Sequence, residues 1–129
     1  MTTTLTYLGW TLLLVIIQIV VASAAKRRQD GMQWASGNRD TQSPPYTGVA
    51  GRMERAQANL LETLPVFIGA VLLSHVSGRD LGIAAWGAGI YFWVRLLYIP
   101  TYALGLVPWR SIVWGVAMIG LVLVLISLI

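Results

Sequence analysis

Long apolar segments separated by short polar ones dominate this chain of 129 residues. A helix that crosses a bilayer needs about 20 mostly apolar residues. Four segments meet that requirement, at about residues 5–25, 52–76, 81–106 and 109–129. The pattern therefore predicts an all-α integral membrane protein, in which a bundle of four transmembrane helices forms a single membrane domain over residues 1–129.

The segment between the first two apolar runs, about residues 26–51, is predicted to be a loop. Its "GNRDTQSPPYTG" has the Gly, Asn, Ser and Pro content of irregular structure. Connections longer than about 12 to 15 residues are usually functional or disordered. The sequence leaves open whether this loop orders over a site, and its Arg39 and Asp40 are expected to form a solvated ion pair.

The end of the first apolar run, "ASAAKRRQD", admits two interpretations. Its small residues fit the cleavage site of a secretory signal peptide. However, no Lys or Arg precedes the run, and "KRR" follows it where a stop-transfer flank would lie. We therefore expect an uncleaved helix.

Composition supports the membrane and excludes several kinds of chemistry. Hydrophobic residues make up 57% of the chain and charged residues only 11%, against about 25% charged in an average soluble domain. The net charge of +4 comes mostly from residues that flank apolar runs, not from a basic stripe of the kind that binds nucleic acid. The absence of cysteine excludes disulfides, thiolate metal sites and a cysteine nucleophile. The single His75 lacks carboxylates at ligand spacing, so we expect an interface residue and no metal.

Basic residues also predict the orientation. The first loop and its edges carry six of them: Lys26, Arg27, Arg28, Arg39, Arg52 and Arg55. The second connection has only Arg79 beside Asp80, and the third has Arg110. By the positive-inside rule, the first and third loops face the cytoplasm and both termini lie outside. Small residues in "GIAAWGAGIY", residues 82–91, are expected to allow close helix contact.

Polar side chains line one face of two predicted helices. At about 100° per residue, four of them on the second helix fall within an arc of roughly 80°. They are Arg52, Arg55, Asn59 and Glu62. On the third helix, four more fall within roughly 60° by the same geometry. They are Tyr91, Arg95, Tyr98 and Tyr102.

A charge in hydrocarbon costs roughly 2.5 to 3.5 kcal/mol, so such residues face partners or water and mark function by default. With Arg110 and Ser111 opening the fourth helix, the stripes predict a cationic pocket on the cytoplasmic side, and hence an anionic ligand. Each residue also has a simpler explanation. Arginines near helix ends can reach the headgroups, Arg95 can pair with Glu62, and the tyrosines can belong to an interfacial belt. Tyr91 is left undecided.

The motifs that carry these residues resemble a known family. "GNRD", "YTGVAGRMERAQANLLETLPVFIGAVLL" and "VRLLYIPTYALGLVPWRS" are similar to the MAPEG family, the membrane-associated proteins in eicosanoid and glutathione metabolism, and especially to its short bacterial members. The resemblance covers about residues 37–115. Its most specific element is the Arg-Ala-x-x-Asn-x-x-Glu pattern that starts at Arg55.

The resemblance implies a homotrimer of four-helix subunits in a bacterial inner membrane, with glutathione bound between neighbouring subunits near the cytoplasmic side. Positions that build or border the site in glutathione-using relatives correspond to eight residues here. They are Arg55, Asn59, Glu62, Arg95, Tyr98, Tyr102, Arg110 and Ser111. The pocket derived from the polar stripes, which adds Arg52, coincides with that site.

Two positions depart from the glutathione-using pattern. Eukaryotic members tend to carry Arg immediately before the Asn, where this chain has Ala58. They also tend to carry Tyr one turn after the Arg of the fourth helix, where this chain has Trp114. The family includes a non-catalytic lipid-binding member, so membership alone does not establish catalysis.

The expected function is a membrane-bound, glutathione-dependent transferase or peroxidase for lipophilic electrophiles. Arg110 is expected to stabilise the thiolate, with a hydroxyl of Ser111 or Tyr102. The expected partners are further copies of the chain, membrane lipids and a lipophilic small molecule. The first alternative is a non-catalytic binder of lipids or small molecules, favoured by Ala58 and Trp114. A small proton-coupled drug exporter is a second alternative, but residues 5–25 lack the acidic residue of such exporters.

Overall fold

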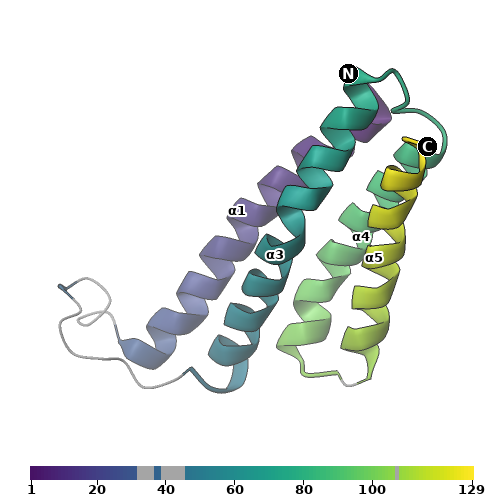
Figure 1. The fold of residues 1–129 in the computed structure, drawn as a ribbon. Coiled ribbons are helices and arrows are strands. Elements are labelled where there is room, and N and C mark those ends of the chain that lie inside the picture. The colour runs from purple at the N-terminus through teal and green to yellow at the C-terminus, as the bar shows by residue number, and fades with distance from the viewer. Residues whose placement is uncertain (32–36, 39–45, 107) are drawn as a thin grey trace.

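The structure, a computed structural model, describes residues 1–31, 37–38, 46–106 and 108–129. Four helices account for most of these residues: α1 (Thr3–Asp30), α3 (Gly48–Val76), α4 (Ile83–Ala103) and α5 (Trp109–Ile126) (Figure 1). All four are long and apolar enough to cross a membrane. The prediction of an all-helical protein with four membrane-spanning helices is therefore confirmed.

The helix ends differ from the predicted ones around the first loop. α1 continues through residues 26–30, and α3 already begins at Gly48. Arg27 and Arg28 occupy the last turn of α1, where cations interact favourably with the helix dipole. Gly31, with a φ of 86°, ends the helix and donates its N–H to the Arg27 carbonyl. The apolar pattern did not predict these helical turns because their residues are mostly polar, although the helix continues through them. Arg39 and Asp40 lie outside the described residues.

Close backbone contact joins α4 to α5, which run side by side along their length (Figure 1). A Cβ added at Gly87 would lie 2.5 Å from the Gly120 carbonyl oxygen, and one added at Gly120 would lie 2.8 Å from the Gly87 oxygen. Only glycine fits such a contact. The small residues predicted to allow helix contact therefore include one that makes it.

The connections divide the bundle into two ends. The N-terminus, the α3–α4 turn and the C-terminus lie at one end, and the α1–α3 and α4–α5 connections lie at the other (Figure 1). Hydrogen bonds hold the first end together. Asp80 Oδ2 accepts from the Thr2 hydroxyl at 2.7 Å and lies 2.8 Å from His75 Nδ1, while Arg79 Nη1 donates to the Leu128 carbonyl at 3.0 Å. Both termini thus share one side, as predicted.

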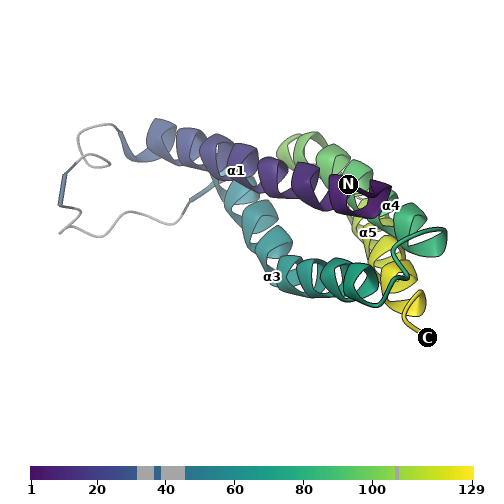
Figure 2. The same cartoon turned by 90° about the horizontal axis from the view of Figure 1, so that it is seen from above.

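α3 packs against α1, α4 and α5, and Figure 2 shows that it bends along its length. Pro65, which lies inside the helix, removes a backbone donor and accounts for the bend. The apolar core beside it contains the stacked rings of Phe67 and Tyr91, whose centroids lie 4.1 Å apart.

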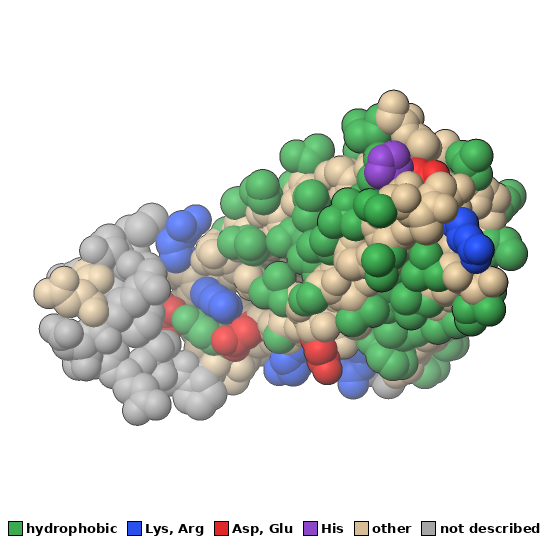
Figure 3. Space-filling model, turned by 45° about the horizontal axis from the view of Figure 1, so that its top comes forward, with side chains coloured by type: hydrophobic (Ala, Val, Ile, Leu, Met, Phe, Trp, Pro, Cys, Tyr) green, Lys and Arg blue, Asp and Glu red, His purple; other side chains and the backbone are tan. Residues whose placement is uncertain are grey.

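Hydrophobic side chains cover most of the face in Figure 3, and ionic ones gather toward the end that carries the α1–α3 connection. Large apolar residues on all four helices are exposed, as expected of a protein whose solvent is lipid. The residues of the predicted polar stripes differ in this respect. Some are exposed on the surface of the bundle, such as Glu62, and some are buried inside it, such as Arg95.

Candidate functional site

A cavity of about 520 Å³ lies among α3, α4 and α5, toward the end of the α4–α5 turn. Seven residues line it: Asn59, Tyr98, Tyr102, Arg110, Ser111, Trp114 and Gly115. Five of these are predicted site residues, from three different helices. α3 supplies Asn59, α4 supplies the two tyrosines, and α5 supplies Arg110 and Ser111.

Arg110 gives this cavity its charge. The Arg110 guanidinium carbon lies 5.5 Å from the centre of the Tyr102 ring, within cation–π range. Tyr102 packs on Tyr98 with ring centroids 5.3 Å apart. Arg110 belongs to the first turn of α5, so the positive end of that helix dipole adds to its charge. The cavity therefore combines positive potential with the hydroxyls of Ser111 and Tyr102.

Arg95 lies behind the cavity and not in its lining. Its side chain is fully buried, with 0% exposed. Arg95 Nη1 donates to Asn59 Oδ1 at 2.7 Å, and its guanidinium lies 4.3 Å from the centre of the Tyr98 ring. Nη2 reaches the Ala56 carbonyl at 3.5 Å. Arg95 thus contacts two lining residues and supports the wall from inside the bundle.

The alternative pairing of Arg95 with Glu62 is wrong for the described chain, where Asn59 takes that position. Three residues along a helix turn the side chain by about 300°, so Glu62 lies roughly 60° away from Asn59. This difference places Glu62 on the exposed face of α3, outside the cavity. Two residues of the same predicted stripe can therefore lie in different environments.

Arg52 and Arg55 lie at the edge of the site. Arg52 Nε donates to the Ala103 carbonyl at 2.9 Å, which satisfies an orphan acceptor at the end of α4. Arg55 Nε donates to the Tyr102 hydroxyl at 3.3 Å. Neither lines the cavity, but Arg55 contacts a residue that does.

Two lining residues were not among the predicted site residues. Trp114 attracted attention only as a departure from the family pattern, and Gly115 was missed. Gly115 follows Ser111 by one helical turn, so the spacing of α5 would have indicated it. Tyr91, left undecided, belongs to the core, where its hydroxyl lies 2.8 Å from that of Thr63.

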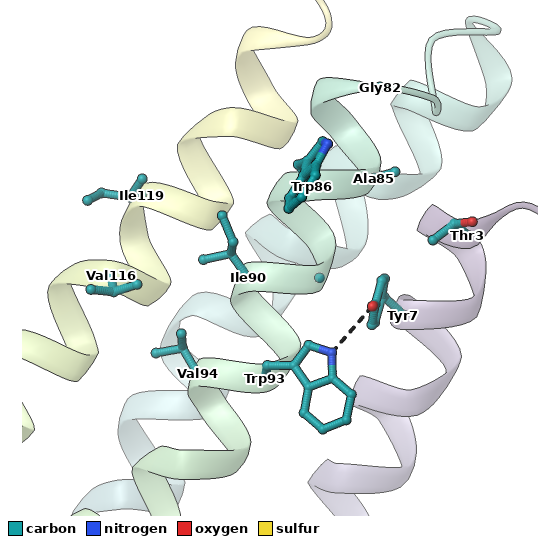
Figure 4. A pocket seen from close by; sticks show the side chains of 11 residues that line it. Thr3, Tyr7, Gly82, Ala85, Trp86, Ile90, Trp93, Val94, Val116 and Ile119 are labelled. Carbon is teal, nitrogen blue, oxygen red and sulfur yellow. Dashed lines mark hydrogen bonds between the residues drawn. The ribbon is translucent and has the colours of Figure 1, made fainter.

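A second hollow, about 600 Å³, lies toward the other end of the molecule among α1, α4 and α5 (Figure 4). Apolar residues such as Trp86, Ile90 and Ile119 form its walls, and Trp93 Nε1 donates to the Tyr7 hydroxyl at 3.3 Å. No Lys, Arg, His, Asp or Glu lines this groove. This groove offers no charge to an anion. The cavity lined by Arg110 does, and it also gathers five of the predicted site residues, so that cavity is the candidate site.

Comparison with known proteins agrees with this assignment of the chain to a membrane bundle. No curated protein and no solved structure matches the sequence. A family model, in contrast, matches residues 7–129, nearly the whole chain, and thereby includes all four helices and every residue of the cavity. That match confirms the resemblance of the polar motifs: this chain belongs to the MAPEG family.

Proposed function

We propose that this protein is a membrane-bound, glutathione-dependent transferase or peroxidase that acts on lipophilic electrophiles. Family membership supports a function of this general kind. The observation that carries the proposal is the convergence of Arg110, three hydroxyl side chains and an amide on one cavity. A peptide anion with a reactive thiol suits such a lining better than an uncharged ligand does.

Catalysis requires the glutathione thiolate. A free thiol has a pKa of about 8.5, and lowering that pKa by two units takes roughly 2.7 kcal/mol of preferential stabilisation of the anion. One or two charge-assisted hydrogen bonds, at about 1.5 to 3 kcal/mol each, provide that much. We assign the charge to Arg110 and the hydroxyl donor to Ser111 or Tyr102. The thiol proton passes to water. The thiolate sulfur then bonds to an electrophilic carbon of a substrate that arrives through the bilayer, and the leaving group departs with the electrons of the broken bond. With a hydroperoxide, the sulfur takes the terminal oxygen as the O–O bond breaks, and the departing alkoxide takes up a proton from water.

The rest of glutathione, two carboxylates and one ammonium, needs further partners. Arg55 contacts the cavity residue Tyr102, and this contact supports our assignment of one glutathione carboxylate to Arg55. Glu62 suits the ammonium, but its own subunit leaves it exposed on a membrane-spanning helix. An unpaired carboxylate there is costly. We therefore propose that the Glu62 face of α3 packs on a neighbouring copy in a homotrimer, where Glu62 serves the site between the subunits.

A non-catalytic ligand-binding protein is the second candidate, and Trp114 favours it. Trp114 forms part of the cavity wall, where glutathione-using relatives tend to place a tyrosine hydroxyl. An indole there enlarges the apolar surface offered to a lipid or drug-like molecule. The other departure, Ala58, is exposed and lies outside the cavity, so it gives this candidate less support.

Titration calorimetry of the purified protein with glutathione, together with thiolate absorbance near neutral pH, separates these candidates. The proposed enzyme shows saturable binding and thiolate formation. Binding without thiolate supports the non-catalytic candidate. Absence of binding at millimolar glutathione contradicts the proposal and directs the search to lipid ligands. The variant Arg79→Ala removes an arginine at the opposite end of the bundle. It should bind glutathione as the wild-type protein does, and weaker binding would show that net charge alone attracts the ligand.

A further inference from the structure

Three buried polar side-chain atoms in the described part of the chain have no hydrogen-bond partner. They belong to two residues only: Oε1 and Nε2 of Gln18, and Nε of Arg95. Gln18 is 1% exposed and Arg95 is 0% exposed. Leaving such groups unpaired costs about 1 to 3 kcal/mol each, and more for a charged group, so their occurrence in one small protein requires an explanation.

Both side chains point into the same space. Gln18 shares the inward face of α1 with Leu14 and Ala22, and α1 packs only against α3 and α4 in the described chain. Gln18 therefore projects between α3 and α4. Arg95, on α4, projects toward α3, as its bonds to Asn59 and Ala56 show.

The two residues also lie beside one packed cluster. Ala22, Ala56 and Tyr98, from α1, α3 and α4, belong to it. α1 and α4 run in the same direction (Figure 1). Gln18 lies one turn before Ala22, and Arg95 lies one turn before Tyr98, so both residues lie next to this cluster, on the same side of it along the chain direction.

Their chemistry is complementary. Arg95 Nε carries a hydrogen and can only donate, whereas Gln18 Oε1 can accept. No ion pair with a carboxylate involves Arg95 within the described chain. The buried Gln18 Oε1, which has no partner there, can accept from its remaining donor. We propose that Gln18 accepts a hydrogen bond from Arg95 Nε, directly or through one buried water, and is thereby a positioning residue of the cavity.

The effect reaches the cavity through Asn59. A guanidinium only donates, so Asn59 has to turn its Oδ1 toward Arg95. Its NH₂ group is then left to donate to a ligand, because Asn59 lines the cavity. By holding the Arg95 guanidinium in place, Gln18 keeps Asn59 in this orientation. We call this series of contacts, from Gln18 through Arg95 to Asn59, the relay. The contact between Gln18 and Arg95 does not depend on the proposed function. Its effect on glutathione binding through Asn59 does rest on that function.

A double-mutant cycle on thermal stability tests the Gln18–Arg95 contact without any ligand. Gln18→Leu alone should lower the Tm by on the order of 5 °C, because it strands a buried guanidinium donor. In an Arg95→Leu background the same substitution should cost nothing or raise the Tm. Additive effects of the two substitutions would overturn the proposal.

Thr11 provides the matched control. It is buried on the same face of α1, but its hydroxyl donates to the Tyr7 carbonyl within its own helix. Thr11→Val should therefore change the Tm by the same amount in the wild-type and Arg95→Leu backgrounds. A coupling equal to that of Gln18 would show a general effect of the helix face and would contradict the contact.

Gln18→Glu decides the matter even where Arg95→Leu does not fold. A carboxylate beside Arg95 finds a cation, whereas a carboxylate elsewhere in this bundle is buried alone. Gln18→Glu should therefore be more stable than Gln18→Leu. The reverse order would overturn the proposal.

Glutathione titration of the same variants then tests the relay. Gln18→Leu should weaken binding about tenfold, and Gln18→Glu should restore most of it. Coupling in the stability cycle without any glutathione binding by the wild-type protein would keep the contact and reject the proposed function. Equal glutathione affinity in wild type and Gln18→Leu, with stability coupling present, would reject the relay alone.

Discussion

Arg95 and Arg110 lie over the rings of neighbouring tyrosines, but they have different roles at the cavity. Arg95 contacts Tyr98 from inside the bundle and donates from Nη1 and Nη2 to the protein groups of Asn59 and Ala56. Arg110 lies over the Tyr102 ring, and its side chain makes no hydrogen bond or ion pair within the described residues, so its donors remain available to a ligand. We therefore expect Arg95 to hold the wall of the cavity in place and Arg110 to bind the ligand.

The first prediction concerns Arg110. Arg110→Ala should lower turnover with glutathione about 100-fold, since a charge-assisted hydrogen bond to the thiolate contributes about 1.5 to 3 kcal/mol. The Tm should change by less than about 2 °C, because Arg110 is partly exposed and holds no helix in place. Steady-state kinetics and thermal unfolding measure both quantities. Unchanged turnover would remove Arg110 from the mechanism.

Asp80 gives a prediction for pH at the opposite end of the molecule. Hydrogen bonds from His75 and then Thr2 hold the pKa of the Asp80 carboxyl below its ordinary value. A folded-state pKa that is depressed contributes stability above the unfolded pKa, about 3.9, and loses it as the pH falls below that value. Asp80→Asn should therefore lower the Tm at pH 7 and have a smaller effect near pH 3.

Thermal unfolding from pH 7 to pH 3 measures this difference. Glu54→Gln is the control, because Glu54 is exposed and pairs only loosely with Lys26, at 3.7 Å. Its effect on the Tm should be small throughout. A penalty for Asp80→Asn that stays constant across the range would show that the hydrogen bonds do not depend on the ionised carboxylate.

At the scale of elements, close packing between α4 and α5 positions the cavity, because Tyr98 and Tyr102 lie on one helix and Arg110 and Ser111 on the other. Gly87 and Gly120 set the distance between the two backbones. The composition of residues 82–91 predicted close contact for one of these helices. It did not identify the partner helix, since small residues permit an approach without specifying what approaches.

Gly87→Ala tests that contact. The new Cβ would lie 2.5 Å from the Gly120 carbonyl oxygen, and backbone on both sides leaves little room to adjust. Overpacking of this kind costs about 1 to 3 kcal/mol, so the Tm should fall by on the order of 10 °C. Gly69→Ala in α3 is the matched control, because nothing lies within 4 Å of its added Cβ. That variant should be neutral or more stable.

At the scale of the whole molecule, the two ends of the bundle differ in charge and in chemistry. The cavity lies toward the end of the α4–α5 turn, which is also the end of the bundle where α1 finishes in its basic last turn. The other end holds both termini and the Asp80 cluster. The bias of positive residues toward one end supports the proposed orientation, in which the cavity opens to the cytoplasm and both termini lie outside.

Cysteine labelling tests the orientation, since the chain has no cysteine of its own. A membrane-impermeant maleimide applied to intact cells should modify Ser77→Cys, an exposed position just after α3. It should spare Arg28→Cys, which is exposed in the last turn of α1, until the membrane is permeabilised. Labelling of Arg28→Cys alone in intact cells would invert the topology.

The sequence by itself determined the four membrane-spanning helices, the family and the residue types of the cavity. The cost of burying charge and the length needed to cross a bilayer act on local segments, and a linear pattern records them. Only the tertiary structure decided which members of each stripe meet. Asn59 faces Arg95 while Glu62 faces outward, and Gln18, the residue of our further proposal, is buried on a helix that carries neither of the predicted polar stripes. Those outcomes depend on the rotation and depth of one helix against another, which no single segment encodes.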